Sequence, residues 1–435
     1  MLRKSKNIFA VLIVFSTIIV AGEKLLVPMD LKQTNHLKAY GVVFYALNKN
    51  IQIEWLLNYR GGSFLCDNIS LLQKEMRVRG IYFEEITISQ AAKIYSEIGN
   101  ESSNAEVVIL EKVPKIAVYV TPNLKPWDDA VTMALEYAEI NYDKIWDEEV
   151  ISGALKKYDW LHLHHEDFTG QYGKFYASQH TAPWYIEQQL LYEKKSRELG
   201  FTKVSEVKNE IVHRIRDYVG NGGFLFAMCS ATDSYDIALA ATKIDICDVV
   251  FDGDGVDRNA QSRLNFNETL VFQNFTIDTN PFRYEYSDID LPQSDPVPMR
   301  DPSTDYFTLF EFSAKHDPVP TMLTQNHVNL VKGFMGQTTA FNRKVIKPHA
   351  IILGERQGSD EIKYLHGNYG RGTFTFYAGH DPEDYQHAVG DPPTDLNLHK
   401  NSPGYRIILN NILFPAAKKK QPAQINVLLT KLLMK

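Results

Sequence analysis

The chain has 435 residues, of which 44% are apolar and 23% are charged, with 25 Gly, 19 Pro and 3 Cys. These values are typical of a folded protein and exclude a disordered chain, a collagen-like repeat and a disulfide-dense miniprotein. The 46 basic and 53 acidic residues give a net charge of −7, so we expect no nucleic-acid partner.

The first 22 residues predict a secretory signal peptide. Three basic residues precede an apolar run from Ile8 to Val20, and the small residues Ala21 and Gly22 follow it. A membrane span needs about 20 apolar residues, so an uncleaved anchor is the minor alternative. We expect export to the periplasm or cell envelope with no stable membrane span. Removing residues 1–22, which hold three basic and no acidic side chains, changes the net charge from −7 to −10.

Residues 23–112 form the first expected α/β block. Short apolar runs predict strands at 25–28, 51–57, 81–86 and 107–110, and helical spacing predicts helices at 34–47, 69–78 and 89–98. Strands that alternate with helices favour a mostly parallel, doubly wound sheet. The linker-like stretch 99–104 lies shortly before the boundary that we place near residue 112.

Residues 113–417 repeat this alternation and form the second expected block. Strands are predicted at 115–121, 158–162, 224–228, 246–251, 349–353, 363–365 and 373–377, and helices at 127–140, 184–199, 205–219, 234–241 and 404–414. The stretch from about 252 to 345 has little periodicity and is interpreted as an insertion. Residues 418–435 are expected to be a solvated basic tail.

Cys229 is the leading candidate nucleophile. The three cysteines are an odd number, so at least one thiol lacks an intramolecular partner, and three buried, inert thiols are the alternative. Cys229 stands between a predicted strand and a predicted helix, with the small residues Ala227 and Ala231 two positions away on either side. A nucleophile elbow needs small residues there. The helix start favours a thiolate, and the Ser230 N–H is a candidate oxyanion donor.

His380 is the candidate base for this thiol. It follows the last predicted strand, and the carboxyl ends of parallel strands share one edge of a doubly wound sheet. Asp381 or Glu383 would orient the imidazole. The alternative is that His380 is a loop histidine that caps a turn.

A histidine-rich stretch follows the predicted strand 158–162. His162 and His164 share one face of an extended strand, and His165 lies on the other. We expect His164, His165 and Glu166 to contact substrate. The alternative is a site for zinc or another divalent metal on His162, His164 and His380.

A run of aspartates, Asp252-Gly-Asp254-Gly-Val-Asp257, lies in the insertion. It lacks the closing Glu of a calcium-binding loop, so a polar turn is expected and calcium is the minor alternative.

The stretch from Lys115 to Phe414 resembles the class I glutamine amidotransferase-like superfamily, in particular its trehalose-utilisation-type branch. The residues that carry the resemblance are 158–164, 222–229 and 370–381. It implies a flavodoxin-like fold with Cys229 at the active edge and Gly170 in the loop that supplies a second oxyanion donor. The chain departs from the pattern because Ala227 and Ala231 replace glycines, and because Glu383 is three rather than two residues after His380.

Most of the mature chain is similar to an exported bacterial family often labelled asparagine synthetase B. Residues 26–41 and 55–64 carry this similarity. The synthetase reaction needs a cysteine directly after the initiator Met, where this chain has Leu2. It also needs a Ser-Gly-Gly-x-Asp-Ser loop for ATP, and Arg60-Gly-Gly-Ser63 lacks the Asp-Ser pair. We therefore expect no ATP-dependent asparagine synthesis.

The sequence thus leads to three hypotheses. The first is an exported cysteine-dependent hydrolase or amidotransferase-like enzyme with no cofactor, acting on an amide, ester or glycan-related small molecule. The second is a non-catalytic ligand-binding protein of the cell envelope that uses the same cleft. The third is the metal-dependent hydrolase described above.

Overall fold

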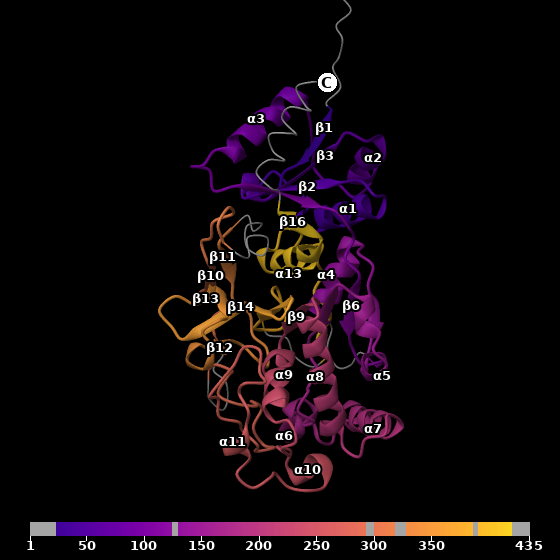
Figure 1. Ribbon diagram of the computed structural model, residues 1–435, viewed down its shortest axis with the longest axis vertical. Coiled ribbons are helices and arrows are strands. Elements are labelled where there is room, and N and C mark those ends of the chain that lie inside the picture. The colour runs from indigo at the N-terminus through magenta and orange to yellow at the C-terminus, as the bar shows by residue number, and fades with distance from the viewer. Residues whose placement is uncertain (1–22, 124–128, 293–299, 318–327, 386–389, 420–435) are drawn as a thin grey trace, which may run out of the picture.

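The computed structural model describes residues 23–123, 129–292, 300–317, 328–385 and 390–419 (Figure 1). The predicted signal peptide and most of the predicted basic tail lie outside these ranges. The described residues form an α/β structure with two sheets, as the strand and helix alternation predicts. No helix in the described ranges is long and apolar enough to cross a membrane.

The small sheet has the strand order β16-β5-β2-β3-β1-β4, and every pairing in it is antiparallel. Its strands are β1 (Lys24–Val27), β2 (Ile53–Leu57), β3 (Ser63–Asp67), β4 (Glu84–Ile86), β5 (Glu106–Leu110) and β16 (Ala417–Lys419). The prediction of a mostly parallel sheet in the first block is wrong. Gly61 and Gly62 adopt positive φ values of 76° and 82°, and the tight turn that they form sends β3 back along β2 as a hairpin.

β16 also changes the predicted boundary at the end of the second block. It pairs with β5, so the last described residues close the edge of a sheet that otherwise comes from the first block. The segment predicted to be a solvated tail from residue 418 therefore begins inside a strand.

The large sheet has the order β11-β10-β13-β14-β15-β9-β8-β6-β7, with β12 paired to β14. β15, β9, β8, β6 and β7 run parallel, and the other pairings are antiparallel. The parallel strands are β6 (Ile116–Tyr119), β7 (Asp143–Ile145), β8 (Trp160–Leu163), β9 (Phe224–Met228) and β15 (Gly372–Tyr377). The antiparallel strands are β10 (Tyr306–Leu309), β11 (Leu330–Lys332), β12 (Phe341–Asn342), β13 (Ile351–Glu355) and β14 (Glu361–Tyr369).

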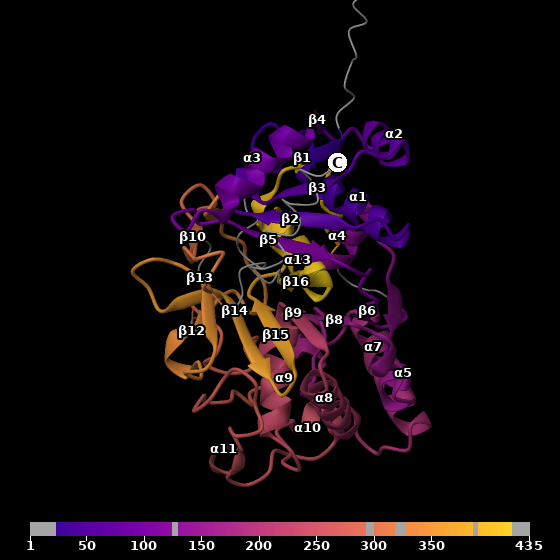
Figure 2. The same cartoon turned by 45° about the horizontal axis from the view of Figure 1, so that its top comes forward.

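Helices separate and flank the two sheets (Figures 1 and 2). α1, α4 and α13 pack against one another between the sheets, and α8 packs against α5, α7 and α9 on the opposite side of the large sheet. The helices are α1 (His36–Asn48), α2 (Ser70–Val78), α3 (Ile88–Gly99), α4 (Ala130–Ala138), α5 (Asp147–Ile151), α6 (Tyr176–Gln179), α7 (Pro183–Glu198), α8 (Val204–Gly220), α9 (Ser230–Ala240), α10 (Val249–Asp252), α11 (Ala260–Arg263) and α13 (Pro403–Leu413).

Successive side chains of a strand point to opposite faces of the sheet, so alternate residues of the large-sheet strands belong to different hydrophobic cores. In β9, Phe226 and Met228 join the core that contains α4 and α13, whereas Leu225 and Ala227 join the core that contains α8 and α9. The first of these cores also includes Trp55 of the small sheet, so the two sheets share one apolar interior.

The predicted loop-and-strand insertion contains the strands β10, β11 and β12. β10 and β11 extend the large sheet beyond β13, and β12 pairs with β14. The strand predicted at 246–251 is wrong, because this segment ends in the short helix α10. The Asp248 carboxylate accepts a hydrogen bond from the Val250 N–H and caps that helix.

Candidate active site

Three parallel strands bring the predicted site residues to one edge of the large sheet. In the β8–β9 register Leu163 faces Ala227, and in the β15–β9 register Tyr377 faces Met228. The residues that follow these strands include His164, Cys229 and His380, and they meet at the same edge. The structure therefore brings His380 to Cys229, although the two are far apart in the sequence.

Cys229 has the backbone conformation of a nucleophile elbow. It lies between β9 and α9 with φ 53° and ψ −142°, a region that costs a non-glycine residue about 1–3 kcal/mol. The flanking Ala227 and Ala231 are fully buried, so larger side chains would have no room. All three cysteines are buried and unbridged, but Cys229 alone among them holds this strained turn.

Backbone amides surround the Cys229 sulfur. Burial raises the pKa of this thiol to about 11, although hydrogen bonds from the N–H groups of Gln337, Ser230 and Thr338 act in the opposite direction. Two of these donors come from the predicted insertion. The loop that holds them is fixed in place because the His380 N–H donates to Met335 O and the Gly379 N–H to Thr338 O, at 2.9 and 2.7 Å.

Three imidazoles gather beside the thiol. The ring centroids of His164 and His165 are 3.9 Å apart. The ring centroid of His380 lies 4.7 Å from that of His164 and 4.5 Å from that of His165. One side-chain atom from each of these histidines and the Cys229 Sγ lie within 4.8 Å of one another. The prediction that His165 lies opposite His164 is wrong, because both residues follow the end of β8 and are no longer extended strand.

His162 belongs to a neighbouring contact. Its Nε2 lies 3.0 Å from Asp129 Oδ2 and its Nδ1 lies 3.2 Å from Phe226 O, so both ring nitrogens face acceptors. The structure therefore does not bring His162, His164 and His380 together as the predicted metal triad.

Asp129 connects His162 to His164, and sequence reasoning missed it. Asp129 Oδ2 also lies 3.2 Å from His164 Nδ1, while its Oδ1 accepts hydrogen bonds from two N–H groups at the start of α4. Burial opposes ionisation, but the two histidines hold the pKa of Asp129 well below its usual range. A signal for it was available, because an N-cap aspartate after β6 lies at the same edge as the residues after β8 and β9.

Asp381 and Glu383 are predicted to orient the His380 imidazole, and in the structure their carboxylates contact other residues. The Asp381 carboxylate accepts hydrogen bonds from Thr394, Tyr405 and the Glu383 N–H at 2.9, 2.7 and 2.8 Å. The Glu383 carboxylate lies 3.1 Å from His399 Nδ1. The carboxylate of Asp129 lies 3.2 Å from the Nδ1 of His164 in the imidazole cluster.

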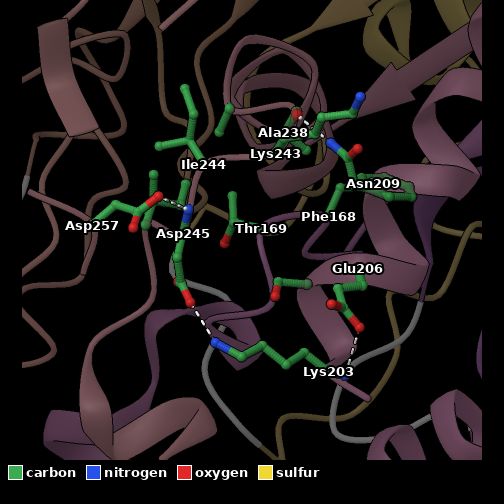
Figure 3. A pocket seen from close by; sticks show the side chains of 13 residues that line it. Phe168, Thr169, Lys203, Glu206, Asn209, Ala238, Lys243, Ile244, Asp245 and Asp257 are labelled. Carbon is green, nitrogen blue, oxygen red and sulfur yellow. Dashed lines mark hydrogen bonds and ion pairs between the residues drawn. The ribbon is translucent and has the colours of Figure 1, made fainter. Parts of the chain in front are cut away.

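Gly170 lies in close contact with α8, and its place in a loop that supplies an oxyanion donor stays a prediction. It has φ +87°, and a Cβ there would meet the backbone of Ser205 at 2.9 Å, which shows that it packs against the first turn of α8. The N–H donors close to the Cys229 sulfur belong to Gln337, Thr338 and the predicted Ser230. The preceding Thr169 lines a cavity of about 430 Å³ on this side of the fold (Figure 3).

Figure 3 also shows the Lys203 ammonium against the Asp245 carboxylate, and Asp257 of the predicted aspartate run beside Asp245. The Lys203 ammonium lies 2.5 Å from Asp245 and 3.0 Å from Asp252, and it also contacts Asp254. A lysine therefore supplies the positive charge at the centre of this group, which favours the predicted polar turn over calcium.

A second cavity, of about 290 Å³, opens beside the imidazole cluster. Its walls include His164, His165, Asp129, Glu166 and Gln188. The predicted substrate contacts His164, His165 and Glu166 thus share one cavity. A small molecule in this cavity would lie next to the imidazoles.

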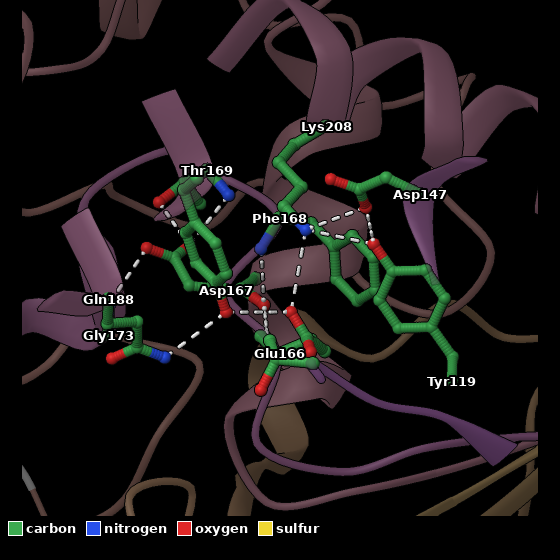
Figure 4. A network of polar contacts seen from close by, with 12 residues as sticks. Tyr119, Asp147, Glu166, Asp167, Phe168, Thr169, Gly173, Gln188 and Lys208 are labelled. Carbon is green, nitrogen blue, oxygen red and sulfur yellow. Dashed lines mark hydrogen bonds and ion pairs between the residues drawn. The ribbon is translucent and has the colours of Figure 1, made fainter. Parts of the chain in front are cut away.

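A buried ion network supports the far wall of this cavity (Figure 4). The fully buried Lys208 ammonium lies 3.0 Å from Asp147, 3.5 Å from Glu166 and 2.9 Å from the Tyr119 hydroxyl. Burial raises the pKa of Glu166 to about 7; the Asp147 charge also raises it, and Lys208 acts in the opposite direction. Near neutral pH, Glu166 therefore exists partly as a neutral carboxylic acid.

No family model matches the chain, and no curated protein matches it. Distant matches among solved structures include two cytoplasmic proteins from Salmonella typhimurium. STM1381 has 13% identity and a TM-score of 0.34, with 70% of this chain and 100% of that chain covered. STM3548 has 12% identity and a TM-score of 0.34, with 71% and 100% covered. The β-galactosidase Gan42B, from G. stearothermophilus, has 12% identity and a TM-score of 0.27, with 62% and 28% covered.

Proposed function

We propose that this chain is an exported cysteine-dependent hydrolase of a small amide or ester, built on the flavodoxin-like fold of the class I glutamine amidotransferase-like superfamily. Numbered in chain order, the five parallel strands β7-β6-β8-β9-β15 have the order 2-1-3-4-5, which is the flavodoxin-like order. The observation that carries the proposal is the strained Cys229 turn, which holds a thiol between backbone N–H donors and imidazoles.

In the proposed reaction, the Cys229 sulfur attacks the substrate carbonyl carbon. The thiol proton passes to His164, whose imidazolium is stabilised by Asp129 at 3.2 Å. The N–H groups of Ser230 and Thr338 face the developing oxyanion. The leaving group takes the proton from His164, and water then releases the acid from the thioester and restores the thiol.

His380 is the other candidate base. It lies in the same cluster, and Asp381 holds the loop that carries it. The two histidines can be separated by experiment, because only the role of His164 depends on Asp129. Asp129→Asn should slow reaction of the thiol about as much as His164→Asn if His164 is the base, and should have little effect if His380 is the base.

The test is alkylation of the mature protein with iodoacetamide in the presence of a chelator, with the modified peptides quantified by mass spectrometry. Cys66 is the internal control, because it is also buried and burial raises the pKa of its thiol to about 12. We expect Cys229 to react at least about tenfold faster than Cys66. Equal rates would contradict the proposed nucleophile.

A second experiment separates catalysis from binding. The mature protein is assayed with p-nitrophenyl acetate, and the expected result is turnover that Cys229→Ser removes and Cys66→Ser keeps. Turnover that survives in folded Cys229→Ser would exclude the nucleophile role. The cavity of about 290 Å³ favours a non-catalytic ligand-binding protein as the second candidate function, and alkylation of Cys229 without turnover would support it.

A further inference from the structure

We propose that His164, His165, Cys229 and His380 form a binding site for one divalent transition-metal ion of the zinc class. The set differs from the triad predicted from the sequence, since it includes His165 and Cys229 and omits His162. Metal binding and nucleophilic reaction would then be alternative states of the same thiol, because a thiolate bound to a metal is not free to attack a carbonyl.

The first observation is that four donor atoms converge. One ring nitrogen from each histidine and the Cys229 Sγ lie within 4.8 Å of one another, and they come from the ends of three neighbouring strands. Three imidazoles and one thiolate are a ligand set that zinc binds in four-coordinate, tetrahedral sites, with bonds of about 2.0–2.3 Å. Softer thiolate and imidazole donors disfavour calcium and magnesium.

The second observation is the state of the His164 ring. It is 1% exposed, and neither Nδ1 nor Nε2 makes a hydrogen bond with the described residues. A buried polar nitrogen without a partner is unfavourable, and a metal ion would supply the missing partner. Its Nδ1 lies 3.2 Å from Asp129 Oδ2, an ion-pair distance without hydrogen-bond geometry, and a small rotation of the ring would let this carboxylate orient a metal-ligating imidazole.

Two other clusters of possible metal ligands occur in the described part of the chain, but their side chains already have other partners. At Asp129, His162 and His164, both nitrogens of His162 already face acceptors, so a metal would have to displace them. At Asp245, Cys247 and Asp252, the Lys203 ammonium lies 2.5 and 3.0 Å from the two carboxylates. The four-residue cluster is therefore the site that we assign.

Binding of the metal is balanced by loss of one proton. Two of the four proposed ligands, His164 and His165, line the cavity of about 290 Å³. As the ion binds, the Cys229 S–H bond breaks, a sulfur–metal bond forms and the proton leaves to solvent, while the imidazoles bind as neutral ligands. The three backbone N–H groups near Cys229 would also stabilise the thiolate.

The test uses the mature full chain, stripped with a chelator and titrated with Co²⁺ as a visible substitute for zinc. We expect one equivalent of Co²⁺ by elemental analysis and an absorption band from thiolate-to-cobalt charge transfer. Cys229→Ser should lose the band, and Cys66→Ser, the matched control from the small sheet, should keep it. Asp129→Asn should weaken Co²⁺ binding about 10–100-fold.

The same samples, treated with iodoacetamide, separate this proposal from the proposed function. Bound metal should protect Cys229 from alkylation, whereas Cys66 should react equally with and without metal. Binding of less than about one tenth of an equivalent of Co²⁺, or an unchanged band in Cys229→Ser, would overturn the metal site and leave the nucleophile untouched. Binding of Co²⁺ by a protein whose metal-free Cys229 is unreactive would support the metal site and contradict the hydrolase.

Discussion

The small sheet and the parallel half of the large sheet are built from similar sequence patterns but place polar residues differently. In the small sheet β1 pairs antiparallel with β3, so the residues that follow these strands emerge at opposite edges. In the large sheet β8, β9 and β15 run parallel, and the residues that follow them meet. The difference shows that strand direction, more than the identity of the polar residues, determines where a site can form.

The two regions also differ in the charges that they bury. The parallel half holds Lys208, Asp147 and Glu166 in one network behind the cavity, all almost fully buried. Near the small sheet, the buried ionisable side chains include His36 on α1, Glu54 on β2 and Arg406 on α13, and the Arg406 guanidinium donates to backbone carbonyls rather than to a carboxylate. We therefore expect the parallel half to depend on ion pairing and the small sheet to depend more on packing and helix capping.

Lys208→Met should give the largest loss of stability and should act on the parallel half. Removing the ammonium leaves Asp147 and Glu166 buried without a countercharge, and breaking a buried ion pair on one side typically costs about 3–5 kcal/mol. The measurement is urea denaturation together with hydrogen exchange read by mass spectrometry. Peptides from α8 and β8 should lose protection more than peptides from β2 and β3.

The matched control is the double variant Lys208→Met with Asp147→Asn. It removes one charge of each sign, so it should recover part of the stability lost in the single variant. An equal loss of protection in both sheets would contradict the view that the network supports only the parallel half. A Lys208→Met protein as stable as the wild type would show that the pair contributes no net stability.

Much of the parallel half could be predicted because its elements are local. The strand Phe224–Met228 and the helices around it follow from apolar runs bounded by glycines, and the elbow at Cys229 follows from small flanking residues. Gln337 and Thr338 could not be found in the same way. They lie in a stretch without periodicity, and only long-range backbone pairing places their N–H groups next to Cys229.

The small sheet was predicted less well because its topology depends on one short strand. Residues 63–67 directly follow the Gly61-Gly62 turn and were not recognised as β3. If β3 is left out, the helix α2 directly follows β2, and the alternation of strands and helices predicts a parallel sheet. With β3, a hairpin forms and every neighbour becomes antiparallel. The pairing of β16 with β5 joins residues from opposite ends of the chain, which no local pattern can show.

His36 should make the stability of the small-sheet side depend on pH. Burial, together with repulsion from Arg406, lowers the pKa of His36 to about 4. The unfolded chain gains this proton near pH 6.5, so the contribution of His36 is fully present above about pH 6.5 and is lost as the pH falls toward 4. The loss amounts to about 3 kcal/mol, since one pKa unit corresponds to about 1.4 kcal/mol.

Because carboxylates also titrate in this range, the measurement is a difference. The free energy of unfolding is followed by urea denaturation between about pH 7 and pH 4.5 for the wild type and for His36→Asn. The wild type should lose more stability than the variant over this interval. Parallel curves would show that His36 is not held neutral in the fold, and would remove this distinction between the two regions.

Thr87→Ala should have the smallest effect and should be confined to the outer face of the small sheet. Thr87 caps α3, since its hydroxyl accepts from the Gln90 N–H at 3.3 Å while Gln90 Oε1 accepts from the Thr87 N–H at 2.8 Å. Loss of such a cap typically costs about 1 kcal/mol, which corresponds to about fivefold faster hydrogen exchange in α3. Thr87→Ser is the control and should keep the protection.

Because α3 packs on a core separate from the two that contain the large sheet, α8 should exchange as in the wild type. Faster exchange in both helices would mean that the two regions unfold as one unit, and that their different chemistry does not extend to different stability.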